Sequence, residues 1–370
     1  MDFLLSYNNF KSSDFKNRYL NVTSLNKVYN LFSAKIIGYS VNKIPIKAIS
    51  IGNGNIKILI WSQMHGNETT STKALIDFIY FLNNDTYLNS CFTFKIIPIL
   101  NPDGAETYSR FNANKIDLNR DAKKQSQPES KALIELYNTF KPDFCFNLHD
   151  QKTFYNINDL PAVTSFLSPS INKEKTINSI RKKSMGVIGY IYKNLQNHIP
   201  GKIGLYNDDF NLNCFGDYLQ FLGTPTILFE TGQDKNSYSR EESRKWISFS
   251  LYLSSICISN NCYDFESYKQ IPVQSNLYCD LLLRNIKINE LLQDIIIEYK
   301  EVLLNNTVIF VPIIKNIGFF DKIFAHKSII LDKNMKNIKF KISIGDDATK
   351  LLKYFKTVSY THLTLPTSYA

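Results

Sequence analysis

The 370-residue chain lacks a long hydrophobic run, a continuous basic segment and a recognisable signal peptide. Its longest apolar stretch, residues 246–259, contains several serines and falls short of the ~20 residues that span a bilayer, so we expect a buried helix there. The first residues, MDFLLSYNNFKSSDF, carry no basic segment ahead of a long apolar one, unlike a typical secretory signal. The net charge is +10, but the lysines are scattered, so we expect neither nucleic acid nor a membrane as a partner.

Cysteines with disulfide spacing are also lacking. The six cysteines form no CxxC pair and no regular framework. Cys145, for example, lies inside the apolar run DFCFNLHD, which is typical of a buried, reduced thiol. Because reduced thiols are usual in cytosolic proteins, the sequence predicts a cytoplasmic protein.

A sizeable core is nevertheless present, since 44% of the residues are hydrophobic. Short apolar runs alternate with helix-like stretches, which predicts an α/β sheet covered by helices. The runs span residues 56–61, 92–100, 143–149 and 225–230, and the helical stretches span residues 129–140 and 171–197. Ser239-Arg240-Glu241-Glu242 matches a capping box and predicts the start of a helix that continues to Ser259.

The pattern of the sequence changes from mixed helix-like and strand-like segments to mainly strand-like segments after about residue 268. Runs such as YCDLLLRNIKI, TVIFVPII and NIKFKISIG are strand-like and are separated by turns. We therefore expect a catalytic domain over residues 1–265 and a small β-rich appended domain over residues 270–357. Residues 358–370 fit neither domain, and SYTHLTLPTSYA resembles a translated sequencing adapter, so we expect a non-native or flexible tail.

A candidate metal site begins at His65-Gly66-Asn67-Glu68, directly after the apolar run 56–61. Gly66 permits a sharp turn, and Glu68 opens a helical pattern that reaches Phe81. His149 ends another apolar run, and the carboxyl ends of parallel strands are where such sheets carry their sites. Catalytic zinc takes three ligands of the His and Glu type and leaves one position open. We therefore predict one Zn²⁺ bound by His65, Glu68 and His149, with the neighbouring Asp150 as a residue that fixes a ligand.

Further motifs follow in a characteristic order. They are Asn101-Pro102-Asp103-Gly104, then Arg110-Phe111-Asn112, then Asp117-Leu118-Asn119-Arg120-Asp121, and last Thr226 to Gly232, which includes Glu230. Together with HGNE and His149, this series resembles the zinc carboxypeptidases of the carboxypeptidase A family, particularly its bacterial branches, over about residues 50–260. The resemblance implies a mixed, largely parallel sheet flanked by helices.

The resemblance also implies roles for individual residues. Glu230 would take a proton from zinc-bound water and pass it to the leaving amine. Arg120, helped by Asn119, would hold a substrate carboxylate, for which the planar guanidinium is suited. Arg110 would polarise the scissile carbonyl. The family also has a tyrosine before the catalytic glutamate, and both Tyr206 and Tyr218 lie in that stretch.

The implied function is a zinc metallocarboxypeptidase that acts on peptides with a free carboxylate. One alternative keeps the fold and the metal but cleaves N-acyl amino acids, as succinylglutamate desuccinylase and aspartoacylase do. Those enzymes share the His-x-x-Glu and Asn-Arg features. A third alternative is an inactive binding protein, which the complete ligand set and Glu230 disfavour.

Overall fold

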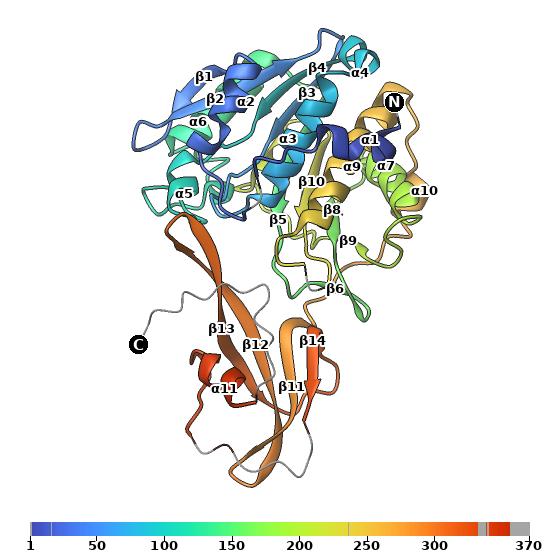
Figure 1. Cartoon of the computed structure of the whole chain (residues 1–370). Coiled ribbons are helices and arrows are strands. Elements are labelled where there is room, and N and C mark those ends of the chain that lie inside the picture. The colour runs from blue at the N-terminus through green and yellow to red at the C-terminus, as the bar shows by residue number, and fades with distance from the viewer. Residues whose placement is uncertain (1, 16, 236, 332–337, 339, 356–370) are drawn as a thin grey trace. The chain divides into compact units, whose positions relative to one another are not determined.

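The computed structural model describes residues 2–15, 17–235, 237–331, 338 and 340–355, and its contacts divide the chain into two units (Figure 1). The first unit comprises Met1–Gln151 and Ala162–Gln274, and the second comprises Lys152–Pro161 and Ser275–Ala370. The second unit thus includes a ten-residue excursion that lies, in sequence, inside the expected catalytic domain. The expected tail, residues 358–370, lies outside the described residues.

An eight-stranded sheet forms the centre of the first unit, in the order β1-β2-β4-β3-β5-β10-β8-β9. Neighbours from β4 through β3 and β5 to β10 are parallel, as are β8 and β9, whereas β1–β2, β2–β4 and β10–β8 are antiparallel. The prediction of a mixed, largely parallel sheet is confirmed. The strands are β1 Lys35–Tyr39, β2 Pro45–Ile51, β3 Ile56–Trp61, β4 Phe92–Ile97, β5 Phe144–Asp150, β8 Thr164–Leu167, β9 Ile203–Leu205 and β10 Thr226–Thr231.

Helices cover both faces of this sheet (Figure 1). The alternation of β3 sends Ile58 and Ile60 into the core under α3 (Thr70–Leu82), α7 (Ser179–Leu195) and α9 (Glu241–Ser259). Leu59 and Trp61 point into the opposite core, under α6 (Pro128–Phe140) and α8 (Phe215–Phe221). The side chains on both faces of β3 are apolar, and each face packs against an apolar core, as expected for a central parallel strand. Shorter helices complete the unit: α1 Phe3–Phe10, η1 Thr23–Leu25, α2 Asn26–Leu31, α4 Thr86–Cys91, α5 Pro102–Glu106, η2 Leu118–Arg120 and α10 Phe265–Tyr268.

A buried ion pair ties the N-terminal segment to two of the covering helices. Asp77 on α3 accepts two hydrogen bonds from Arg244 on α9, at 2.7 Å from Nε and 2.6 Å from Nη2. The Asp77 carboxylate also accepts from the backbone N–H of Ser12 and from the hydroxyl of Tyr7. Both charged side chains are at most 1% exposed, so the pair forms part of the core.

The start of α9 corrects the sequence prediction of a capping box. The helix runs from Glu241 to Ser259, but its N-cap is Arg240 in a left-handed conformation (φ 55°), and no side chain caps it. Glu241 instead bonds to Lys11 and Arg244, and a carboxylate in the first turn is favourable at a helix N-terminus. Similarly, α3 begins at Thr70, two residues later than expected. Among the described residues, no helix combines the length and apolar character required to cross a bilayer.

The second unit is built on a four-stranded sheet in the order β13-β12-β11-β14. Its strands are β11 Tyr278–Ile288, β12 Leu291–Leu304, β13 Thr307–Gly318 and β14 Phe324–Ile330, and a short hairpin pairs β6 Asn156–Ile157 with β7 Leu160–Pro161. Leu351 and Leu352 of α11 (Thr349–Tyr354) pack on Leu281, Leu283 and Ile297 of the sheet. The prediction of a β-rich C-terminal region is confirmed.

Candidate metal centre

The turn that carries His65 and Glu68 is held by tight backbone packing. A Cβ atom on Gly66 would lie only 1.9 Å from the carbonyl carbon of Gly104, so no larger residue fits there. Asn101 supports the same turn, because its Nδ2 donates to the carbonyl of Met64 and its Oδ1 accepts from the N–H of Gly104. The NPDG segment thus packs beneath the HGNE turn and shapes it.

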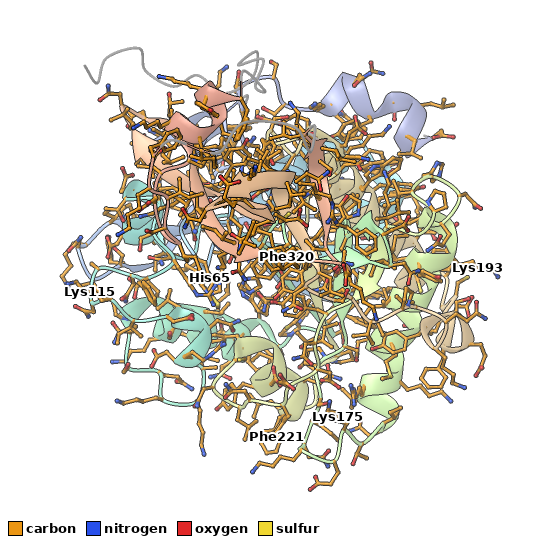
Figure 2. All side chains as sticks on the ribbon, turned by 90° about the horizontal axis from the view of Figure 1, so that it is seen from below. His65, Lys115, Lys175, Lys193, Phe221 and Phe320 are labelled. Atoms are coloured by element: carbon orange, nitrogen blue, oxygen red, sulfur yellow. The ribbon has the colours of Figure 1, made fainter. Side chains whose placement is uncertain are left out.

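The predicted ligands His65, Glu68 and His149 lie together and are buried. The Nδ1 atom of His65 is 2.8 Å from Glu68 Oε1, and the Nδ1 atom of His149 is 2.7 Å from Glu68 Oε2. The two Nδ1 atoms are 3.2 Å apart. His65, labelled in Figure 2, is 2% exposed. These three residues are the one group of metal-donor side chains found within the described part of the chain.

The donor set fits a tetrahedral zinc ion. Two atoms bound to one Zn²⁺ at ~2.0–2.2 Å with tetrahedral angles lie ~3.3–3.6 Å apart. With one donor atom taken from each residue, the three atoms lie within 4.8 Å of one another, and the two Nδ1 atoms are 3.2 Å apart, so displacements of about an ångström would bring them to coordination geometry. Two imidazoles and one carboxylate are also the ligand types of a catalytic zinc site with one open position.

Asp117 orients His65, a role that the sequence did not reveal. Its Oδ1 is 3.0 Å from His65 Nε2, which places the N–H on Nε2 and leaves Nδ1 with a lone pair for the metal. The same carboxylate accepts from Nε and Nη2 of Arg110, at 3.1 and 2.9 Å. Arg110 Nη1 then reaches toward the ligands, 3.4 Å from Glu68 Oε1. Asp117 therefore links a candidate metal ligand, His65, to the predicted carbonyl-polarising arginine, Arg110.

The neighbouring charges and burial shift the pKa values of the three candidate ligands in different directions. Burial opposes charge on His65, but the carboxylates of Glu68 and Asp117 outweigh it and raise the pKa of His65. Burial opposes charge on Glu68, but the nearby His65 and His149 outweigh it and hold the pKa of Glu68 well below its ordinary value. Burial lowers the pKa of His149, which favours the neutral imidazole that binds metals. Burial also opposes charge on Asp117, but hydrogen bonds from His65 and Arg110 keep its pKa low.

Glu230 lies beside the cluster on the next strand. It pairs in register with His149 across the parallel strands β5 and β10, so the two side chains point to the same face of the sheet. Its exposure is 6%. Burial, reinforced by the carboxylates of Glu68 and Asp150, raises the pKa of Glu230 well above its ordinary value. A carboxylate with raised proton affinity is a stronger base than an ordinary one.

The predicted carboxylate-binding residues follow Asp117 directly. Asp117 caps the short η2 turn by accepting from the N–H of Asn119. The Oδ1 of Asn119 accepts from the N–H of Phe215 at the start of α8, so this side chain fixes the loop. Arg120 is exposed, and its Nη1 donates to the carbonyl of Asn119 and contacts Cys214 Sγ at 3.2 Å. Its other nitrogens make no hydrogen bond within the described residues.

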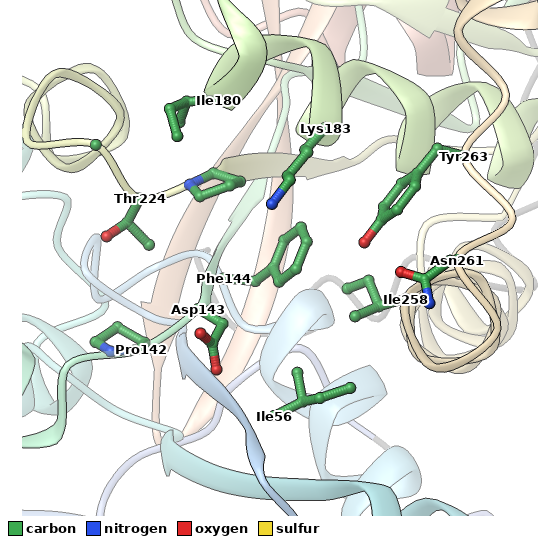
Figure 3. A pocket seen from close by; sticks show the side chains of 12 residues that line it. Ile56, Pro142, Asp143, Phe144, Ile180, Lys183, Thr224, Ile258, Asn261 and Tyr263 are labelled. Atoms are coloured by element: carbon green, nitrogen blue, oxygen red, sulfur yellow. The ribbon is translucent and has the colours of Figure 1, made fainter.

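A separate hollow of about 390 Å³ lies at the opposite ends of the strands, next to the first residues of β3, β5 and β10 (Figure 3). Lys183 and Tyr263 extend over an apolar floor that includes Phe144 and Ile258. None of the candidate metal ligands lines it. Since ligands of such sheets bind at the carboxyl ends of the strands, the cluster around His65 is the stronger candidate for the active site.

Comparisons with known proteins agree with this geometry. The model of the zinc carboxypeptidase family matches residues 23–198, a range that contains the predicted residues from His65 to His149 but not Glu230. The chain is 25% identical over 124 residues to "Probable carboxypeptidase 2" of Arthroderma benhamiae and of Trichophyton verrucosum. Each match covers 29% of this chain and only 23% of the relative.

Solved structures share the fold at lower identity. A metallo-carboxypeptidase from Pseudomonas aeruginosa has a TM-score of 0.54 at 15% identity, covering 65% of this chain and 69% of that one. Carboxypeptidase A from Helicoverpa armigera has a TM-score of 0.50 at 14% identity, covering 72% of this chain and 80% of that one. Residues 23–198, which include the His65, Glu68 and His149 cluster, are thus similar to the zinc carboxypeptidase family.

Proposed function

We propose that this chain is a zinc-dependent metallocarboxypeptidase that removes the C-terminal residue from peptides with a free carboxylate. One observation carries the proposal: three buried metal donors, His65, Glu68 and His149, converge next to the buried carboxylate of Glu230. A metal site with a purely structural role would need no proton acceptor beside an open coordination position, whereas a hydrolytic metal site needs a proton acceptor there.

The catalytic steps divide among the residues of this cluster. When bound, Zn²⁺ lowers the pKa of water and polarises a carbonyl oxygen. Glu230 accepts the proton of the attacking water and then delivers it to the leaving nitrogen, as general base and general acid in turn. Its burial keeps competing water away and raises its pKa, so the same carboxylate is able to hold the proton between the two steps.

Arg110 stabilises the oxygen on which negative charge develops. Asp117 holds its guanidinium through two nitrogens, and Nη1 points toward Glu68. An arginine that is already oriented costs little reorganisation when charge appears on the substrate. Its side chain is 40% exposed, which leaves room for a substrate carbonyl to approach.

Arg120 anchors the terminal carboxylate of the substrate. Its guanidinium is exposed and uses only Nη1 for contacts to Asn119 and Cys214 within the described chain. The remaining edge is free to form a two-point pair with a carboxylate, the geometry that distinguishes arginine from lysine. The bond from Asn119 to α8 keeps this loop in place.

The test is a turnover assay on zinc-loaded protein with blocked dipeptides, their C-terminal amides and N-acyl amino acids. We expect cleavage of the dipeptides with a free carboxylate only. Glu230→Gln should retain zinc and lower kcat by ~10²–10⁴-fold, whereas Glu266→Gln, on an exposed side chain of α10, should leave kcat unchanged. A Glu230→Gln enzyme with near-normal kcat would contradict the assigned base.

Substrate choice separates the proposal from its alternatives. Cleavage of N-acyl amino acids but not peptides would identify a deacylase, and zinc binding without turnover on either class would identify a binding protein. The Pseudomonas relative was solved in complex with (2-guanidinoethylmercapto)succinic acid. Because this compound presents carboxylates, we expect it to compete with substrate here, and to do so less well in Arg120→Ala.

A further inference from the structure

Asp150 caps the helix that follows the metal ligand Glu68, although it belongs to a different strand. Its Oδ2 accepts from the N–H of Thr70 and its Oδ1 from the N–H of Ser71, both at 2.8 Å. The residue in the N-cap position of α3, Thr69, makes no side-chain cap of its own. The Asp150 side chain is 3% exposed, so these two bonds are shielded from water and are charge-assisted.

The backbone of the same residue holds Glu68 directly. The N–H of Asp150 donates to Glu68 Oε2 at 3.2 Å, the oxygen that also lies 2.7 Å from His149 Nδ1. Asp150 therefore contacts the ligand-bearing turn twice, through its N–H at the Glu68 carboxylate and through its carboxylate at the first turn of α3. It also follows His149 directly in the chain, so it connects all the ligand-bearing segments.

Arg240 places a counter-charge near the Asp150 carboxylate. Arg240 Nη1 lies 4.0 Å from Asp150 Oδ2, and both side chains are 3% exposed. Arg240 Nη1 also donates to the carbonyl of Thr231, the residue after Glu230. The contacts thus continue from α3 through Asp150 to the end of β10, the strand that carries Glu230.

We propose that Asp150 is a positioning residue of the metal centre, which sets the distance between Glu68 and His149 by clamping the Glu68 turn onto the end of β5; the inference rests on the proposed zinc site. The two ligands are 81 positions apart in the sequence, so only non-covalent contacts set their separation. Outer carboxylates that orient ligands commonly change metal affinity by ~10–100-fold when removed. An ordinary helix cap would affect folding and leave metal affinity alone.

The experiment measures zinc affinity in the full chain, after removal of metal with a chelator and titration with Zn²⁺ against a chromophoric competitor. Asp150→Asn keeps the shape but places an N–H₂ group against backbone donors, and Asp150→Ser keeps one acceptor. Asp85→Ala is the matched control, since Asp85 caps the next helix, α4, through Leu88. Visible spectra of the Co²⁺-substituted proteins report ligand geometry, which a role in folding alone would not alter.

We expect the zinc dissociation constant to rise by ~10–100-fold in Asp150→Asn, and by less in Asp150→Ser, with changed Co²⁺ spectra. Asp85→Ala should lower the melting temperature while retaining the wild-type zinc affinity and spectrum. Zinc affinity within threefold of wild type in both Asp150 variants would overturn the inference, as would an equal loss in Asp85→Ala. If Asp150→Asn does not fold, Asp150→Ser decides.

The outcome for the wild type separates this inference from the proposed function. A wild-type chain that binds zinc tightly but cleaves no peptide would refute the peptidase proposal and leave the role of Asp150 standing. A wild-type chain that takes up no zinc would overturn both.

Discussion

Neutralising Asp77 should destabilise the first unit far more than neutralising an exposed carboxylate. Asp77 pairs with Arg244 through two short hydrogen bonds in a fully buried setting, and it also holds the Ser12 N–H and the Tyr7 hydroxyl. Asp77→Asn keeps the volume of the side chain but removes its charge. It leaves the buried Arg244 guanidinium with only the partly exposed carboxylate of Glu241 as a counter-ion and turns an N–H₂ group toward other donors.

The expected loss follows from burial of the partner charge. Breaking a buried ion pair by removing one member costs about 3–5 kcal/mol when the desolvated partner is left uncompensated. The remaining pair of Arg244 with Glu241, whose side chain is 29% exposed, places the expected loss at the lower end of this range. The exposed pair Lys269–Glu266 provides the comparison, with side chains that are 53% and 77% exposed. Glu266→Gln should cost at most ~1 kcal/mol. The difference between the two variants therefore measures burial rather than charge as such.

Equilibrium urea unfolding followed by tryptophan fluorescence measures this difference. Both tryptophans, Trp61 and Trp246, lie in the first unit, so the signal reports the unit that contains Asp77. With a slope of about 3 kcal/mol per molar urea, the Asp77→Asn midpoint should fall by roughly 1 M or more. An Asp77→Asn midpoint that matches that of Glu266→Gln would refute the reasoning.

Three further predictions concern the metal, the substrate and pH. His149→Ala should lose both zinc, measured by metal analysis, and activity, because two ligands do not hold zinc tightly; retained stoichiometric zinc would show that the ligand set is wrong. Arg120→Ala should lower kcat/KM by ~10–100-fold on substrates with a free carboxylate, because a charge-assisted hydrogen bond is worth ~1.5–3 kcal/mol. In this variant, amidating the substrate carboxylate should lower kcat/KM no further. Burial lowers the pKa of Lys73 from 10.5 to about 8, so the unfolded chain binds more protons than the folded one between those values and stability should rise with pH there. Lys73→Met should flatten the rise of urea stability between pH 8 and pH 10, and an unchanged slope would assign it to other groups.

The elements around the metal were predictable because their signals are local. Strand β3 has apolar side chains on both faces and is followed closely by His65 and Glu68. One short segment of sequence therefore predicts both the strand and the turn. His149 likewise ends a continuous apolar run that became β5. Placement at strand ends was sufficient to bring these side chains together, since adjacent parallel strands end at the same edge of the sheet.

The supporting carboxylates were harder to predict because their partners are distant in sequence. Asp117 bonds to His65 across 52 positions, and nothing in Asp117-Leu118-Asn119-Arg120 distinguishes a ligand-orienting aspartate from a turn-forming one. The resemblance implies a carboxylate-binding role for the neighbouring Asn119 and Arg120, and the side chain of Asn119 accepts a hydrogen bond from the first residue of α8. For the same reason, no local sequence pattern predicts that residues 152–161 belong to the second unit.

The balance of charge around the two histidines explains why this site suits a divalent cation. Its charged groups are four carboxylates and two guanidinium groups: Glu68, Asp117, Asp150, Glu230, Arg110 and Arg240. If all are ionised, two negative charges remain, which is the amount that one Zn²⁺ neutralises. The raised pKa of Glu230, caused by burial and by the carboxylates of Glu68 and Asp150, reflects this excess. A bound divalent ion would offset this repulsion and favour the ionised form of Glu230, the form that the proposed role as general base requires.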